Sequence, residues 1–440
     1  MPSGRLVFLL RCRVVICLAA LFPALFLRVD TPEGPDAEVR EFRLGELAAR
    51  LKAMPAGPEW DYFAGILANR QGRNEESIRL LESVLPAIRT SHPERGFITL
   101  EALADDYVKC FRYADAARTY DDLINNFSSQ MEAKKLQGTK DDAQVMHVLQ
   151  GTPAQTISWQ GSTRLNTERN MLASLNTELT VNGVQEKWLL DTGANLSVVS
   201  KSMANRLGLK PLPGTAQTMA GLTGIENAMQ LAILPTLEMG SATLHNVVLL
   251  ILEDHSLNIS NGKQRYQING IIGYPVFQAL GVITFTHDGW FEAGEAARRS
   301  LAGTQMYMKQ LAPVIQCGVE GLDLPFTFDT GASGSTLSKR YLDKFHSKIG
   351  TWKKGENRSS GAGGIVKRKI YIQKRVTFSI GDEKVTLKDM AIFTEAMGTD
   401  LDEVYGNLGQ DLVAGSESFT LDFSKMIFSL GKPLPSKEVY

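Results

Sequence analysis

Two carboxylates in matched surroundings are the residues of this sequence with the clearest potential for chemistry. Asp191 opens the segment Asp191–Ala194 (Asp-Thr-Gly-Ala), and Asp329 opens an identical segment, Asp329–Ala332. Two carboxylates held about 4 Å apart repel by about 4 kcal/mol at an effective dielectric constant of about 20, so they share one proton. The ionised member can then accept a proton from water, and the protonated member can donate one. The two segments therefore predict a general acid–base pair.

These segments belong to an internal repeat with an offset of 138 residues. At this offset nine of the 21 positions in Val181–Lys201 are identical in Val319–Lys339. A fixed period with this much agreement indicates a duplicated structural unit. A second pair of matched segments, Asn269–Phe277 and Tyr405–Val413, follows at an offset of 136. We expect lobe 1 to span residues 163–294 and lobe 2 to span residues 303–435.

Strand-like patterns place each aspartate at the end of a strand. The run Glu178–Val181 alternates polar and apolar side chains and then reaches Asn182-Gly183, a strong β-hairpin signal. The returning strand is apolar and ends at Asp191, which is a rigid place to hold a carboxylate. Glycine-containing turns at Ala220–Gly224 and Ser360–Gly364 predict a further hairpin in each lobe.

The region before the repeat shows helical periodicity. Apolar side chains recur at three- and four-residue steps within residues 36–150. Residues 67–78 and 103–117 each predict a helix, a short turn and a second helix, an arrangement that resembles tetratricopeptide repeats. This region is expected to bind a protein partner, to inhibit the next domain as a pro-segment, or only to pack on it. The stretch from Lys134 to Gly161 lacks a sustained period, and we assign residues 151–162 as a linker.

The N-terminus predicts export to the periplasm or the extracellular space. Three arginines up to Arg13 precede the apolar run Val14–Leu27, a pattern typical of a secretory signal. Arg28 and Val29 interrupt the usual cleavage-site pattern, so a membrane anchor is an alternative, although 14 residues are fewer than the ~20 of a typical span. A buried N-terminal helix fits the basic residues poorly. We assign residues 1–35 to this signal or anchor.

Composition argues against several other function classes. The 47 basic and 48 acidic residues nearly cancel, which gives no support for a nucleic-acid partner. Neither the six histidines nor the four cysteines have the spacing of metal ligands, and we expect no metal and no cofactor. The motifs His-Glu-x-x-His and Gly-x-Ser-x-Gly of metal- and serine-dependent hydrolases do not occur.

The repeated motif carries a family resemblance that covers residues 163–435. Asp-Thr-Gly-Ala after an apolar strand, a glycine-rich hairpin and a later apolar-apolar-Gly segment resemble the aspartic peptidases of the pepsin and retropepsin clan. The closest similarity is to the retropepsin-like aspartyl proteases of bacteria. The resemblance implies an α+β multidomain chain, with N-terminal α-helical hairpins before a two-lobed, mainly β acid-protease fold. Both halves lie in one chain, which implies an internal pseudo-dimer that is complete as a monomer.

The resemblance also implies roles for individual residues. Asp191 and Asp329 would be the catalytic pair. Thr192 and Thr330 would hydrogen-bond across the lobe interface, and Gly193 and Gly331 would let backbone N–H groups approach the carboxylates. The candidates for flaps that close on a substrate are Gly221, Gly224, Gly361 and Gly363.

The implied function is that of an aspartic endopeptidase acting on a peptide or protein substrate. The alternative is a non-catalytic peptide-binding or scaffold protein that has inherited a protease fold. Alanine after each Asp-Thr-Gly, and the lack of a Tyr-Gly pair in the first hairpin, depart from pepsin. The subsite preferences of pepsin therefore do not carry over.

Overall fold

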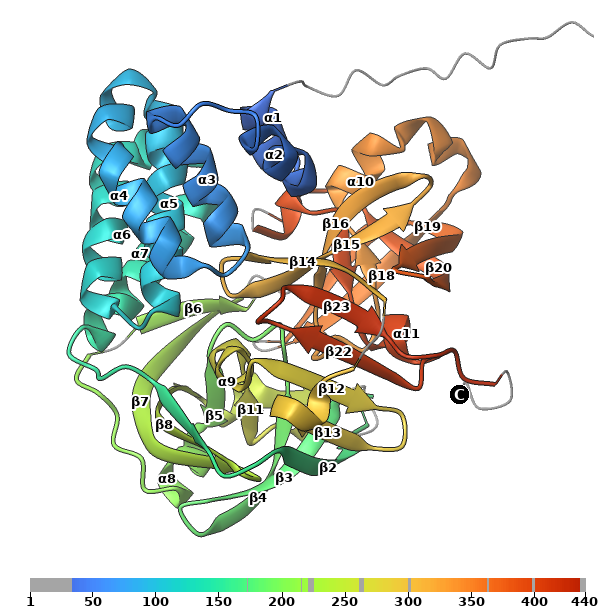
Figure 1. Cartoon of the computed structure of the whole chain (residues 1–440). Helices are drawn as coiled ribbons and strands as arrows, with labels where there is room; N and C mark the ends of the chain where they lie inside the picture. The colour runs from blue at the N-terminus through green and yellow to red at the C-terminus, as the bar shows by residue number, and fades with distance from the viewer. Residues whose placement is uncertain are drawn as a thin grey trace, which may run out of the picture.

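The computed structural model describes residues 34–435 apart from 172, 215, 221–224, 261–264, 300–301, 362–363 and 398–399. In this part a layer of helices lies beside two lobes built mainly from strands (Figure 1). The predicted order, helical hairpins followed by a two-lobed β-domain, is confirmed. The signal or anchor assigned to residues 1–35 lies almost entirely outside the described residues. No helix of the described part is both long and apolar enough to cross a membrane.

Consecutive helices of the helical layer pack against each other as hairpins. They are α1 (Pro35–Arg40), α2 (Leu44–Leu51), α3 (Pro58–Arg70), α4 (Asn74–Ser91), α5 (Pro93–Lys109), α6 (Tyr113–Phe127) and α7 (Ala133–Leu149). The turns after α1, α3 and α5 share one geometry, in which the residue after the helix cap adopts a left-handed conformation. These residues are Phe42 (φ 55°), Gly72 (φ 67°) and Phe111 (φ 57°).

The stretch predicted to be irregular contains regular structure. Helix α7 occupies most of Lys134–Gly161, and strand β1 (Thr156–Trp159) pairs antiparallel with β8 of lobe 1. The linker assigned to residues 151–162 was therefore wrong over β1. Helix α7 lies within residues 36–150, the region predicted to be helical, although its buried positions include polar Thr139 and Asp141, which interrupt the apolar period.

The two lobes contain their elements in the same order, except that lobe 1 has an extra pair of strands, β9 and β10, before its central strand. Lobe 1 contains β2 (Thr163–Arg169), β3 (Leu175–Val181), β4 (Val184–Leu190), β5 (Ser197–Ser200), α8 (Lys201–Arg206), β6 (Ala216–Ala220), β7 (Ile225–Met239), β8 (Ala242–Leu252), β9 (Asn258–Ser260), β10 (Arg265–Gln267), β11 (Gly270–Ile272), α9 (Tyr274–Leu280), β12 (Val282–Thr286) and β13 (Trp290–Ala293). Lobe 2 contains β14 (Gly303–Lys309), β15 (Ala312–Val319), β16 (Leu322–Phe328), β17 (Thr336–Leu337), α10 (Lys339–Lys344), β18 (Lys353–Gly361), β19 (Gly364–Ile380), β20 (Glu383–Phe393), β21 (Gly406–Leu408), α11 (Gln410–Val413), β22 (Ser418–Asp422) and β23 (Ile427–Leu430).

A short central strand organises each lobe. In lobe 1, β11 lies between β4, to which it is parallel, and β5, to which it is antiparallel. In lobe 2, β21 lies in the same way between β16 and β17. The hairpins that deliver the two aspartates turn at Asn182-Gly183 and Glu320-Gly321, all four residues with positive φ. The hairpin predicted at Asn182-Gly183 is confirmed.

The lobes join through one antiparallel sheet, in the order β2, β13, β12, β22, β23 and β14. Strand β12 of lobe 1 pairs with β22 of lobe 2 along five residues of each. On this seam the ring of Phe285 stacks on that of Phe419, with 4.8 Å between centroids. The shared sheet thus fixes the two lobes, and with them the two Asp-Thr-Gly-Ala loops, relative to each other.

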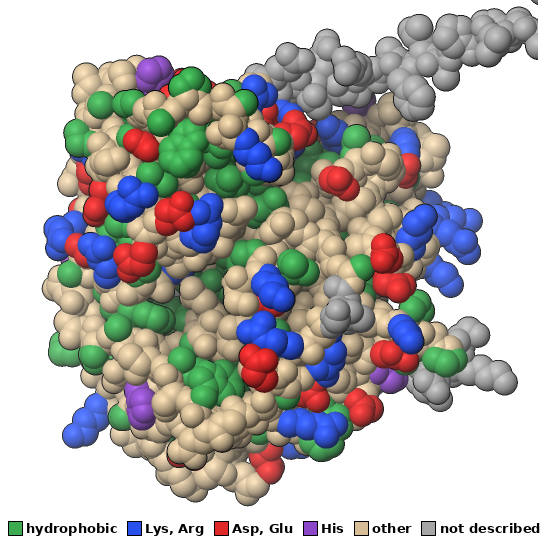
Figure 2. Space-filling model, viewed as in Figure 1, with side chains coloured by type: hydrophobic (Ala, Val, Ile, Leu, Met, Phe, Trp, Pro, Cys, Tyr) green, Lys and Arg blue, Asp and Glu red, His purple; other side chains and the backbone are tan. Residues whose placement is uncertain are grey.

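Charge is distributed unequally over the surface. Figure 2 shows acidic and basic side chains interspersed over the helical layer, whereas Lys and Arg gather at the edge of lobe 2. Residues 353–393, which form β18 to β20, contain ten Lys or Arg and four Asp or Glu. The equivalent stretch of lobe 1, residues 216–252, contains no Lys or Arg and two Glu. The two halves of the β-domain are therefore electrostatically unequal.

Candidate active site

The two Asp-Thr-Gly-Ala segments meet at the interface of the lobes. Each aspartate follows its apolar strand, and its backbone N–H bonds to the neighbouring central strand. The N–H of Asp191 donates to the carbonyl of Ile272 at 3.0 Å, and that of Asp329 donates to Leu408 at 2.9 Å. Both aspartates are half-buried, and Gly193 is exposed, so that solvent reaches this junction.

The two threonines form a symmetric set of hydrogen bonds beneath the aspartates. The N–H of Thr192 donates to Oγ1 of Thr330 at 2.9 Å, and the N–H of Thr330 donates to Oγ1 of Thr192 at 3.1 Å. Each hydroxyl in turn donates to a carbonyl of the opposite lobe, that of Phe328 or Leu190. Both threonines are fully buried, and every one of these polar groups is paired across the interface.

The glycines of the two segments show how closely the carboxyl groups approach. A Cβ at Gly193 would lie 2.5 Å from Cγ of Asp329, and a Cβ at Gly331 would collide in the same way with the carboxyl group of Asp191. Neither glycine needs a left-handed conformation, so the requirement is steric. Each carboxyl group therefore lies against the loop that carries the other.

The surroundings of the two carboxyl groups differ. Asp329 accepts hydrogen bonds from the N–H groups of Gly331 (2.7 Å) and Ala332 (3.1 Å) and from Nδ2 of Asn407 (3.3 Å). Asp191 accepts one from the N–H of Gly193 at 2.9 Å and also interacts with the N–H of Ala194, so Asn407 is the donor that has no counterpart in lobe 1. Burial and the adjacent Asp329 raise the pKa of Asp191 well above its ordinary value. The raised pKa of Asp191 therefore places the shared proton on Asp191.

Sequence reasoning gave no role to three polar residues of lobe 2. Asn407 stands at the position of Ile271 in lobe 1, and Asp411 at that of Pro275. The N–H of Ser335 donates to Oδ2 of Asp411 at 2.9 Å, and the Ser335 hydroxyl donates to Oδ1. A position-by-position comparison of the two repeats would point to Asn407 and Asp411, because each is a polar residue where lobe 1 has an apolar one.

The flap glycines fall mostly outside the described residues. These are Gly221, Gly224 and Gly363. Gly361 is the last residue of β18 and pairs with Gly364 of β19. The strands that lead to both turns are described, and they form the hairpins β6–β7 and β18–β19. Within the described ranges, no three His, Cys, Asp or Glu side chains lie close enough together to hold a metal ion.

Removing one threonine hydroxyl should loosen the junction. Thr330→Val leaves the N–H of Thr192 and the carbonyl of Leu190 unpaired in a buried place, so we expect the free energy of unfolding to fall by about 2–4 kcal/mol. Thr330→Ser keeps the hydroxyl and should lose about 1 kcal/mol or less. Urea unfolding of both variants measures the difference. Equal losses would contradict the role given to the hydroxyl.

Removing the amide beside Asp329 should alter the pH dependence of the site. Asn407→Ile copies lobe 1 and removes a hydrogen-bond donor from the carboxylate of the pair, which makes the charged form of the pair less stable. The acid limb of kcat/KM against pH should then move to higher pH, with a loss of about tenfold in kcat/KM. Thr327→Val is the control, because it removes only the hydroxyl that bonds to Oδ1 of Asn407. An unmoved acid limb in Asn407→Ile would refute this role.

Comparisons with known proteins were made for the whole chain. Residues 177–276, which include Asp191, match the model of the aspartyl protease family. No curated protein sequence matches the chain.

Two solved structures are similar to it. Conglutin gamma, a basic 7S globulin from lupine seeds, is 10% identical with a TM-score of 0.40, over 62% of this chain and 95% of that one. The basic 7S globulin from soybean is 10% identical with a TM-score of 0.39, over 62% of this chain and 94% of that one. The family match covers the strand, the Asp-Thr-Gly-Ala segment and the central strand of lobe 1. The chain therefore contains an aspartyl protease domain.

Proposed function

We propose that the chain is an aspartic endopeptidase in which Asp191 and Asp329 act as one unit. The observation that carries this proposal is the crosswise contact at the lobe interface, where a Cβ on either glycine would strike the opposite carboxyl group. Such contact puts two acids within reach of the same water molecule and the same peptide bond.

In the proposed reaction the two carboxyl groups have different roles. Ionised Asp329, supported by three donors, accepts a proton from water while the water oxygen forms a bond to the scissile carbonyl carbon. Protonated Asp191 gives its proton to the carbonyl oxygen, which yields a tetrahedral diol. The proton on Asp329 then passes to the amide nitrogen, Asp191 takes back a proton from one hydroxyl of the diol, and the C–N bond breaks to give a carboxylic acid and an amine. No covalent acyl-enzyme forms.

The substrate would be a polypeptide in extended conformation. The hairpins β6–β7 and β18–β19 follow the two catalytic loops and offer strand edges to which an extended peptide can add. By the same proposal one chain suffices for catalysis, since both carboxyl groups belong to it. Export, or anchoring through the N-terminal apolar run, is also a proposal and rests on the sequence pattern alone.

The alternative, a non-catalytic binding or scaffold protein, explains less of the site. Placing two carboxyl groups in contact costs stability, because neither can ionise freely next to the other. A protein that only binds a peptide gains nothing from this repulsion. A protein that must activate water gains an acid and a base at one point.

Replacing either aspartate should abolish cleavage and leave the fold intact. For Asp191→Asn and Asp329→Asn we expect kcat/KM on a peptide library to fall at least about a hundredfold, because general acid–base catalysis is lost. Asp382→Asn, at an exposed turn between β19 and β20, is the matched control and should cleave like the parent. Cleavage by either catalytic variant at the parental rate would overturn the assignment.

Asp191→Asn should also change how the stability of the chain depends on pH. The raised pKa of Asp191 means that the folded chain binds this proton more tightly than the unfolded chain. This contribution is present at low pH and is lost as the pH rises from 3.8, the ordinary value, through the raised one. Asp191→Asn removes the loss, so its melting temperature should exceed that of the parent at neutral pH and approach it near pH ~3. A variant less stable than the parent at neutral pH would contradict the proposed repulsion.

A further inference from the structure

The catalytic loop of lobe 2 is held in place by a residue of its own lobe. Asp411, in the short helix α11, accepts hydrogen bonds from both the N–H and the hydroxyl of Ser335. The Ser335 hydroxyl in turn accepts a hydrogen bond from the N–H of Gly409 at 2.9 Å. The end of the Asp329 loop is thus fixed to the helix that follows the central strand.

Lobe 1 has no such side chain at the equivalent position. Ser197 matches Ser335, and its hydroxyl accepts a hydrogen bond from the N–H of Gly273 at 3.0 Å. Where lobe 2 has Asp411, however, lobe 1 has Pro275, which cannot bond to the serine through its side chain. The Asp191 loop therefore lacks the internal support that the Asp329 loop has.

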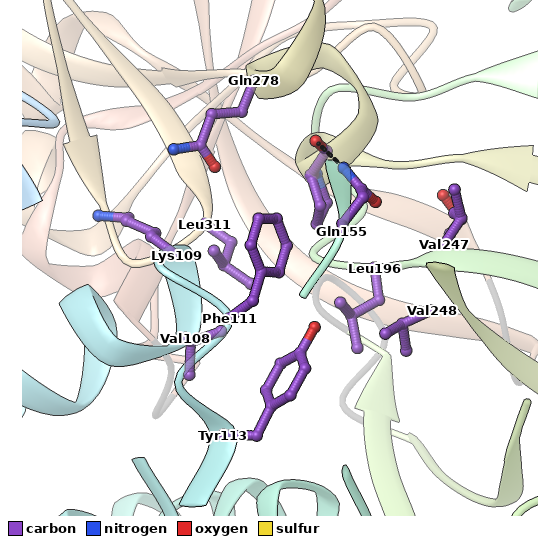
Figure 3. A pocket seen from close by; sticks show the side chains of 12 residues that line it. Val108, Lys109, Phe111, Tyr113, Gln155, Leu196, Val247, Val248, Gln278 and Leu311 are labelled. Carbon is purple, nitrogen blue, oxygen red and sulfur yellow. Dashed lines mark hydrogen bonds between the residues drawn. The ribbon is translucent and has the colours of Figure 1, made fainter. Parts of the chain in front are cut away.

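The helical layer occupies this place instead. A small pocket is lined by Leu196, Ser197 and Pro275 of lobe 1 and by Phe111 and Tyr113 of the turn between α5 and α6. In Figure 3 the Phe111 ring stands in the middle of the group and the Tyr113 hydroxyl points toward Leu196.

The segment between the helical layer and lobe 1 adds a hydrogen bond at the same place. Gln155 donates through Nε2 to the carbonyl of Pro275 at 2.9 Å, which is the dashed line of Figure 3. Residues from outside lobe 1 thus lie across a small pocket from the loop after Asp191 and hydrogen-bond to the helix after the central strand.

The backbone of Phe111 is a second, independent observation. Phe111 has φ 57°, a conformation that costs a residue with a side chain more than it costs glycine. The same turn after α3 uses Gly72. A strained residue persists where its side chain is needed, and the Phe111 side chain is the one that lines the pocket beside the catalytic loop.

We propose that Phe111 and Tyr113 are positioning residues for Asp191. The helical layer supports the Asp191 loop from outside, as Asp411 supports the Asp329 loop from within. This inference rests on the proposed function and makes the helical layer a necessary part of the active enzyme. A chain shortened to residue 163 onward would keep both aspartates and lose the support of one.

Phe111→Gly in the full chain tests the proposal. Glycine adopts the left-handed turn without strain, so we expect the variant to stay folded and its melting temperature to change little, while its activity falls. We expect kcat to fall about tenfold with little change in KM, because a displaced carboxyl group affects the transition state more than substrate binding. Hydrogen exchange should become faster in residues 191–200 and stay unchanged in residues 329–338.

A transplant from lobe 2 provides the rescue. Pro275→Asp gives lobe 1 the carboxylate that lobe 2 has, so in the Phe111→Gly background it should restore both kcat and exchange protection. Phe42→Gly is the matched control, since Phe42 occupies the same kind of turn but its carbonyl accepts from Gln316 of lobe 2. Pro275→Asp should not rescue any loss in that variant. Rescue of both variants alike would refute a specific support.

The remaining outcomes also decide the matter. Unchanged kcat and unchanged exchange in Phe111→Gly would overturn the proposal. If Phe111→Gly unfolds, Phe111→Leu, which keeps an apolar side chain, must show the same faster exchange in residues 191–200 to a smaller degree. If the parent cleaves no peptide, the proposed function fails, while the exchange measurements still decide whether the helical layer supports the Asp191 loop.

Discussion

Two carboxyl groups that repel each other are held together by hydrogen bonds buried directly beneath them. In the threonine clasp, formed by Thr192 and Thr330, the hydroxyl and the N–H of each threonine hydrogen-bond to the opposite lobe, and all of these polar groups are paired. The two carboxyl groups stay close despite this repulsion only if the lobes cannot move apart, and the sheet that β12 and β22 share holds the lobes together. The chemistry therefore depends on an interface rather than on either lobe alone.

A duplicated scaffold does not make a symmetric site. The same backbone presents Asp191 and Asp329 to one another, but Asn407 adds a donor on only one side. The shared proton therefore resides preferentially on one carboxyl group, which acts as the acid, while the other acts as the base. The support of the two loops is divided in the same way, from within for lobe 2 and from the helical layer for lobe 1.

Much of this arrangement could be predicted because it is repetitive. The offset of 138 residues indicated two equivalent lobes, and the strand-to-loop pattern indicated where each aspartate would lie. The clasp beneath them, and its pairing of residues 138 positions apart, followed only from the family resemblance. The contacts of Asn407 and Asp411 were missed because a search for identities between repeats passes over positions where the repeats differ.

The role of the helical layer could not be predicted for another reason. Periodicity reports which face of a helix is apolar, but it does not say which other element covers that face. Phe111 and Leu196, which line the same small pocket, are 85 positions apart and have no sequence relation to each other. The left-handed backbone conformation of Phe111 points to this role, and only the three-dimensional structure reveals it.

The central claim is that Asp191 and Asp329 divide one proton between them. The most direct measurement is a carbon-13 NMR titration of the two carboxyl groups in the intact chain, with each aspartate assigned by its asparagine variant. The account predicts two well-separated steps for the pair, with Asp191 holding its proton to a pH well above the ordinary pKa of aspartate. Two independent titrations, both close to the ordinary pKa of aspartate, would contradict it.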